Sequence, residues 1–121
     1  MRNSTKIAPP NSLLFVSDQR KRQIPDIKRG SRIWSTPSCI AVGCLAFMDG
    51  NTDVTLEDVG GVYSASPPAF DGNLETPSRV IVVSTVEDTT ILQLAVPNLV
   101  TRVRIWTNHP TEPDKISIGA G

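Results

Sequence analysis

The stretch Leu99–Thr107, with the sequence LVTRVRIWT, shows the clearest two-residue alternation in this chain of 121 residues. Successive side chains of a β-strand point to opposite faces, so the alternation predicts a strand with one apolar face and one polar face. The face expected to point into a core carries Thr101, Val103 and Ile105. The opposite face carries Arg102, Arg104 and Trp106.

Two apolar segments precede this strand at short intervals. Arg79–Val86 and Thr89–Val96 are predicted to be buried strands, with Glu87-Asp88 as the turn between them. Together with Leu99–Thr107 they predict a three-stranded antiparallel meander. A last short strand is expected at Lys115–Ile118.

The middle of the chain predicts a β-hairpin. The apolar run Cys39–Met48 is followed by Asp49-Gly50 and then by the alternating segment Asp53–Glu57. An Asp-Gly pair between two such runs is the strongest short-range hairpin signal.

A stretch rich in glycine and proline follows the predicted hairpin. Gly60-Gly61 is expected to turn the chain before Val62-Tyr63. Ser64–Ser78 holds three prolines and a glycine, and it is predicted to be a long surface loop. Loops of this length often carry function.

The first third of the chain is more polar. Met1–Ser12 has no periodicity and is predicted to be a flexible tail, followed by a short apolar strand at Leu13–Ser17. Asp18–Arg32 is polar and is interrupted by Pro25, which leaves room for one helical turn capped by Ser17 or Asp18.

These elements predict a mainly β protein with little helix. We expect one antiparallel sandwich or barrel of about seven or eight short strands over residues 13–121, after the flexible N-terminal arm. No apolar run approaches the roughly 18–20 residues that a membrane-spanning helix needs. We therefore expect a soluble cytoplasmic protein without a membrane partner.

The net charge of zero hides an uneven distribution. Residues 1–33 hold eight basic and two acidic residues, whereas residues 34–121 hold four basic and ten acidic ones. The basic arm consists chiefly of Arg20, Lys21, Arg22, Lys28, Arg29 and Arg32. Such a segment suits nucleic acid, an acidic partner or the acidic part of a second copy, but it is equally typical of a solvated surface segment.

The cysteine and histidine content argues against a disulfide or a metal site. Cys39 and Cys44 are five residues apart in a predicted strand, so they face opposite sides and are expected to be buried free thiols. The single histidine, His109, cannot complete the set of about four ligands that zinc takes. Asp49–Asp53 resembles the start of a calcium loop, but the required later glycine and glutamate are missing. We expect no metal and no cofactor.

Catalytic motifs are equally scarce. No G-x-S-x-G, phosphate-binding loop or dinucleotide fingerprint is present. An unfamiliar enzyme remains an alternative, with a site at a subunit cleft formed by the Ser64–Ser78 loop and a pocket of Tyr63, Phe70 and His109. A nucleic-acid binder led by the basic arm is a further alternative, although few aromatic residues are available to stack on bases.

The outward face of Leu99–Thr107 is the strongest candidate binding surface. Arginine and tryptophan are the residue types most enriched in binding hot spots, which favours an interface at Arg102, Arg104 and Trp106. In the competing interpretation Trp106 packs beneath a loop or the N-terminal arm, and the arginines cover it.

The order of these features resembles a known family. Arg79–Ile118 runs strand, turn, strand, Val96-Pro97 and then a strand ending in Arg104-Ile105-Trp106-Thr107, after the run Gly43–Phe47 and the pair Asp49-Gly50. This order is similar to that of the small competence-associated nuclease inhibitors, which are β-rich proteins that bind and silence a nuclease. The resemblance implies a binding protein with no catalytic residues to transfer, and the basic arm has no counterpart in it.

We therefore expect a small interaction or ligand-binding module that associates with itself. The contact would use Arg102, Arg104 and Trp106, and the basic arm would contact acidic residues of a neighbouring copy. The candidate acidic residues are Asp53, Glu57 and Glu87.

Overall fold

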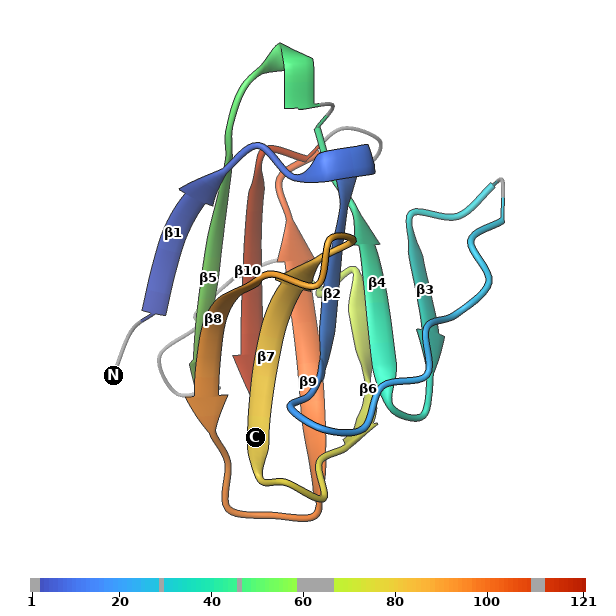
Figure 1. Ribbon diagram of the computed structural model, residues 1–121, viewed down its shortest axis with the longest axis vertical. Helices are drawn as coiled ribbons and strands as arrows, with labels where there is room; N and C mark the ends of the chain where they lie inside the picture. The colour runs from blue at the N-terminus through green and yellow to red at the C-terminus, as the bar shows by residue number, and fades with distance from the viewer. Residues whose placement is uncertain (1–2, 29, 46, 59–66, 110–112) are drawn as a thin grey trace.

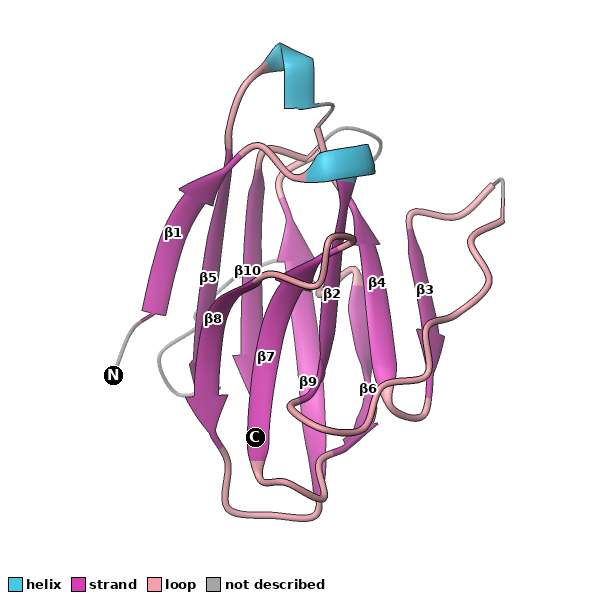
Figure 2. Ribbon diagram, viewed as in Figure 1, coloured by secondary structure: helices cyan, strands magenta, loops and turns pink. Residues whose placement is uncertain are grey.

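The computed structural model describes residues 3–28, 30–45, 47–58, 67–109 and 113–121. Within these ranges, ten strands form two five-stranded sheets that pack face to face as a β-sandwich (Figures 1 and 2). The mainly β architecture with little helix is confirmed. The described strands do not close into a barrel, and they outnumber the seven or eight that the sequence predicts.

The first sheet, sheet A, has the strand order β1-β5-β10-β9-β6. Its strands are β1 (Asn3–Ile7), β5 (Thr52–Asp58), β10 (Lys115–Ala120), β9 (Val100–Thr107) and β6 (Phe70–Glu75). Neighbouring strands are antiparallel except β5 and β10, which are parallel.

The second sheet, sheet B, is antiparallel throughout and has the order β3-β4-β2-β7-β8. Its strands are β3 (Ile33–Thr36), β4 (Cys39–Gly43), β2 (Leu13–Asp18), β7 (Val80–Thr85) and β8 (Thr90–Ala95). Two short 3₁₀ turns, η1 (Pro10–Ser12) and η2 (Phe47–Asp49), lie at the end of the sandwich drawn uppermost in Figure 1.

The core lies between the two sheets and is almost entirely aliphatic. Its fully buried residues include Leu14, Val16, Ile40, Val54, Leu56, Ile81, Val83, Val103, Ile105, Ile116 and Ile118. The predicted alternation of β9 is confirmed, because Thr101, Val103 and Ile105 are buried and the residues between them are not. This interleaving of two inner faces is the usual way in which a sandwich buries apolar area.

The predicted hairpin around Asp49-Gly50 is wrong. The strand β4 ends at Gly43, and the chain then leaves sheet B through η2 and enters sheet A as β5. Both sides of β4 are already occupied, by β2 and β3, so β5 has no edge of β4 to pair with. The Asp-Gly pair therefore turns a connection between sheets.

The predicted meander is also only partly correct. β7 and β8 form the expected hairpin, with Asp88 in its turn at φ 63°. The chain then crosses to sheet A, where β9 pairs with β10 and β6. Thr76 holds the crossing, because its N–H donates to the Leu99 carbonyl at 2.8 Å and its Oγ1 to the Asn98 carbonyl at 2.8 Å. The crossing places the apolar faces of β8 and β9 on opposite sides of one core.

The segment predicted as one long loop contains a strand. Phe70–Glu75 forms β6 at the edge of sheet A, paired with β9. Gly72 interrupts its apolar positions, so the two-residue period is hard to see in the sequence. The predicted turn at Gly60-Gly61 and the Val62-Tyr63 segment lie outside the described residues.

The N-terminal segment expected to be a flexible tail supplies an edge strand instead. Asn3–Ile7 pairs antiparallel with Thr52–Leu56 of β5, and Ile7 packs against the core. The strand shows no clear apolar periodicity in the sequence, because Ile7 is the one apolar residue among Asn3–Ile7. No helix in the described part of the chain is long and apolar enough to cross a membrane.

The helical turn expected after β2 is not formed by the residues described there. Asp18 instead accepts hydrogen bonds from the N–H groups of Arg20 and Lys21, at 2.9 and 3.0 Å. A carboxylate that caps two successive N–H groups turns the chain without requiring a helix.

Candidate functional site

The three predicted interface residues lie on one face of the sandwich. Arg102, Arg104 and Trp106 alternate with the buried residues of β9 and point away from the core on the outer side of sheet A. Arg102 is exposed, whereas Arg104 and Trp106 are half-buried. We call these three residues the Arg/Trp face.

The neighbouring strands shape the surroundings of this face. Arg104 lies between Asp71 of β6 and Gly119 of β10, and Trp106 lies beside Ser117. Gly119 itself is buried, so the backbone beside Arg104 is covered in the folded chain.

Arg102 is held by an ion pair with β6. Its Nε donates to Asp71 Oδ1 at 2.8 Å and its Nη2 donates to Oδ2 at 2.6 Å. These hydrogen bonds lower the pKa of Asp71, and the positive charge of Arg104 lowers it further. The same contacts raise the pKa of Arg102. This two-point geometry fixes the orientation of the guanidinium.

The Arg/Trp face contains a buried hydrogen-bond donor, the Nε of Arg104. This Nε has no hydrogen-bond partner among the described residues. Buried donors in folded proteins nearly always have a partner, which is another protein group or a bound water. An acceptor from outside the described residues would therefore complete this site.

The basic arm is not an N-terminal arm but the connection between β2 and β3. Residues 19–32, which we call the strap, follow β2 across the outer face of sheet B (Figure 1). Trp34 Nε1 donates to the Lys28 carbonyl at 3.0 Å, and the Gln23 N–H donates to Ser38 Oγ at 2.9 Å. The strap is thus attached to sheet B at Gln23 and at Lys28.

Two strap cations already have acidic partners in the same chain. Lys21 Nζ lies 2.9 Å from Glu75 Oε1, and Arg22 Nη2 lies 3.0 Å from Asp88 Oδ1. Arg20, Lys28 and Arg32 are exposed, and Arg29 lies outside the described residues.

A small second cluster lies on the outer face of sheet B, where Phe15, Cys39 and Ala41 are buried with Trp34 packed against them. Cys39 belongs to this cluster and Cys44 to the main core, so the predicted opposite orientation of the two thiols is confirmed. Both cysteines are free and buried, and burial raises the pKa of each thiol to about 11.

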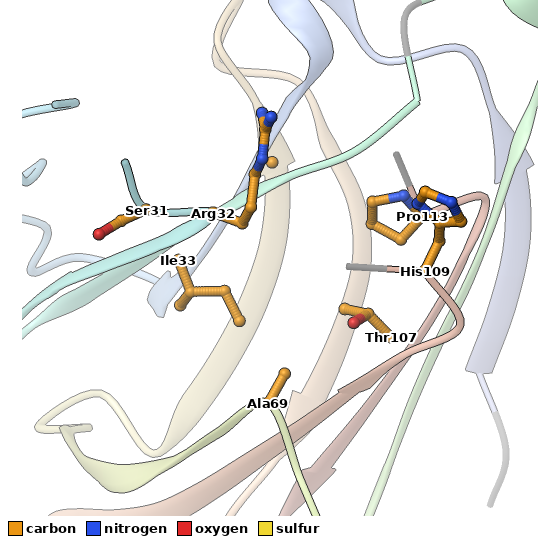
Figure 3. Close-up of a pocket in the computed structure, with 8 residues that line it drawn as sticks. Ser31, Arg32, Ile33, Ala69, Thr107, His109 and Pro113 are labelled. Atoms are coloured by element: carbon orange, nitrogen blue, oxygen red, sulfur yellow. The ribbon is translucent and has the colours of Figure 1, made fainter. Parts of the chain in front are cut away.

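The predicted loop pocket is only partly assembled among the described residues. His109 lines a cavity of about 300 Å³ with Arg32 and Thr107, whereas Phe70 packs against the core instead. Figure 3 shows Ser31 and His109 on opposite sides of this cavity, which is not the arrangement of a nucleophile and its base. Tyr63 lies outside the described residues. In the described part of the chain, no three His, Cys, Asp or Glu side chains gather as a metal site would require.

Asp71 and Glu75, the acidic partners of the Arg/Trp face and the strap, are not among the predicted site residues. Both lie in β6, which was expected to be a loop. The only signal for this strand was the spacing of Phe70, Gly72 and Leu74, whose positions all face inward.

Known proteins share the fold of this chain, but none of the comparisons assigns it to a family. No family model and no curated protein sequence matches the chain. The crystal structure of ComJ, inhibitor of the DNA degrading activity of NucA, from Bacillus subtilis, matches with a TM-score of 0.72 and 10% identity, covering 98% of this chain and 93% of that one. A structure described as Crocagin biosynthetic gene J matches with a TM-score of 0.48 and 10% identity, covering 98% and 94%. The predicted resemblance to nuclease inhibitors is therefore supported at the level of the fold.

Proposed function

We propose that this chain is a protein-binding module and that the Arg/Trp face is the centre of its contact surface. The observation that carries the proposal is the buried Arg104 Nε, which has no acceptor among the described residues. A carboxylate or carbonyl of a partner would supply that acceptor.

The chemistry of the face supports a protein partner. Tryptophan and arginine contribute large contact areas and directional donors, and they dominate binding hot spots. Asp71 holds the Arg102 guanidinium in place through two hydrogen bonds, so less side-chain freedom is lost on binding.

A second copy of the chain is the partner that the charge distribution supports. The strap segment 19–32 holds six basic residues and one acidic residue, whereas residues 34–121 carry a net negative charge. The exposed strap cations Arg20, Lys28 and Arg32 of one copy would face exposed acids such as Glu87 of the other. Such a contact weakens as salt is raised.

Light scattering at low and high salt tests self-association. We expect a mass of at least twice the 13.1 kDa of the chain, reduced by salt and by Trp106→Ala or Arg104→Gln. Arg79→Gln is the matched control, because Arg79 is an exposed arginine outside the face and the strap. A monomer at both salt concentrations would contradict self-association.

A nuclease is the second candidate partner, and the shared fold with the ComJ inhibitor favours it. The chain would then reduce DNA degradation by a nuclease of the NucA type, and Trp106→Ala would restore degradation while Arg79→Gln would not. A monomeric chain that leaves such a nuclease fully active would contradict both forms of the proposal.

A further inference from the structure

A second site lies on the other side of the molecule, on the outer face of sheet B. A cavity of about 320 Å³ opens where the strap leaves β2. Ser17, Val82, Ser84 and Thr90 from three adjacent strands form its floor, and Arg20, Arg22 and Asp88 stand around it. Its lining is mostly polar, unlike that of an apolar ligand pocket.

Ser17 provides the first sign of a ligand. This residue is only 1% exposed, and its Oγ has no hydrogen-bond partner among the described residues. A buried hydroxyl without a partner is costly, so sites of this kind are normally completed by a bound group or water.

Arg22 provides a fixed set of donors at the same cavity. Its Nη1 donates to Ser84 Oγ at 3.2 Å, its Nη2 lies 3.0 Å from Asp88 Oδ1, and its guanidinium lies 5.6 Å from the centre of the Phe15 ring. A guanidinium has five N–H donors, so these contacts leave several for a ligand. Arg20 adds a second, exposed guanidinium.

The two acidic residues at the cavity, Asp18 and Asp88, differ in their burial and in the number of hydrogen bonds that they accept. Asp18 is buried and accepts four hydrogen bonds, from the N–H groups of Arg20, Lys21 and Ser78 and from Ser78 Oγ. Asp88 has a side chain that is 79% exposed, and Arg22 is its partner. A ligand can therefore replace Asp88 on Arg22 without breaking a buried network.

We propose that this cavity binds a phosphate-type oxyanion, with Arg22, Arg20 and the Ser17 hydroxyl as donors and with Asp88 as the internal group that the oxyanion displaces. The hydrogen-bonding groups left at the cavity are mainly donors, and a tetrahedral oxyanion presents only acceptors when fully ionised. The site is separate from the Arg/Trp face and shares only Arg20 with the proposed strap contact, so the Ser17 and Asp88 variants test it independently of the proposed protein-binding function.

Titration with inorganic phosphate, followed by amide shifts in NMR spectra, tests this site. Sodium chloride at matched ionic strength is the reference, and phosphoserine is the second probe. We expect saturable shifts of the Ser17, Arg22 and Ser84 amides with phosphate and none with chloride. Tighter binding of phosphoserine would indicate a phosphorylated side chain as the source of the group, and equal or tighter binding of phosphate would indicate the free ion.

Four variants make the test specific. Ser17→Ala removes a hydroxyl without a described partner, so it should preserve folding and weaken phosphate binding by roughly tenfold. Arg20→Gln should weaken binding, whereas Lys28→Gln, an exposed strap cation outside the cavity, should not. Asp88→Asn should strengthen binding, because it weakens the internal competitor of the oxyanion.

The proposal is tested by whether each variant strengthens or weakens phosphate binding. Opposite changes for Ser17→Ala and Asp88→Asn would support the site. Shifts that do not saturate, that chloride reproduces, or that Lys28→Gln reduces as much as Arg20→Gln would show an adventitious ion only and would overturn the proposal.

Discussion

Arg102 and Asp71 are joined diagonally across two strands of sheet A, since Arg102 lies opposite Asn73 in the register and Asp71 lies opposite Arg104. The two hydrogen bonds of 2.8 and 2.6 Å connect the inner strand β9 to the edge strand β6. Asp71 thereby holds Arg102 and also lies close enough to Arg104 for its pKa to be lowered by that charge. The Arg/Trp face is organised by an acid from a segment that the sequence presents as a loop.

Replacing Arg102 should be visible in the titration of Asp71. Hydrogen bonds from Arg102 lower the pKa of Asp71 below its ordinary 3.8, so Arg102→Gln should raise the midpoint toward that value. Carboxyl ¹³C NMR measures the change directly. Arg79→Gln should leave the midpoint where it is in the unmodified chain, and an equal shift in both variants would refute this account of the ion pair.

Asp18 should stabilise the fold in a pH-dependent way. Burial raises the pKa of Asp18, but four hydrogen bonds to its carboxylate together bring the pKa below its ordinary 3.8. The stabilisation is therefore present above about pH 3.8 and is lost as the pH falls below that value. Asp18→Asn should cost about 1–3 kcal/mol in urea unfolding at pH 7, and progressively less below pH 3.8.

Asp26→Asn is the matched control for Asp18, because Asp26 is an exposed acid of the strap. It should change the free energy of unfolding by less than about 0.5 kcal/mol. A cost of Asp18→Asn that stays constant down to low pH would be inconsistent with the hydrogen-bonded carboxylate.

The two thiols should be unreactive in the folded protein. Burial raises the pKa of Cys39 and Cys44 to about 11, so little thiolate forms near neutral pH and access is restricted. Iodoacetamide should label both residues slowly in buffer and rapidly in guanidinium chloride, with the native rate rising toward pH 11. Fast native labelling of either cysteine in intact-mass spectra would contradict its burial.

Removing residues 1–8 should destabilise the sandwich. The truncation takes away the antiparallel partner of β5 and the apolar contact of Ile7 with the core. We expect a loss of about 1 kcal/mol, from the partly buried isoleucine together with the lost strand pairing. Lys6→Gln breaks only the exposed 3.8 Å ion pair with Asp53 and should have little effect. An unchanged melting temperature for the truncated chain would instead indicate a flexible tail.

Local patterns determined the orientation of individual strands. The alternation in Leu99–Thr107 correctly separated the buried Ile105 from the outward Arg102, because the side-chain period of a strand is a property of the backbone alone. The hairpin of β7 and β8 and the buried, unpaired cysteines followed from equally local rules. The strand Phe70–Glu75 could not be predicted in this way, because a glycine at one of its inward positions interrupts the apolar alternation.

Only the tertiary structure decided which strands are partners. Asp49-Gly50 and Pro97-Asn98 look like hairpin turns, yet both connect the two sheets, because turn residues specify a change of direction and not the sheet that receives the next strand. The parallel pairing of β5 with β10, distant in the sequence, follows from burying Leu56 and Ile118 in one core. The basic segment is likewise a strap, because Ser38 and Trp34 meet it only after the strands of sheet B have paired. Long-range burial and pairing set these relationships, and no short stretch of the chain contains them.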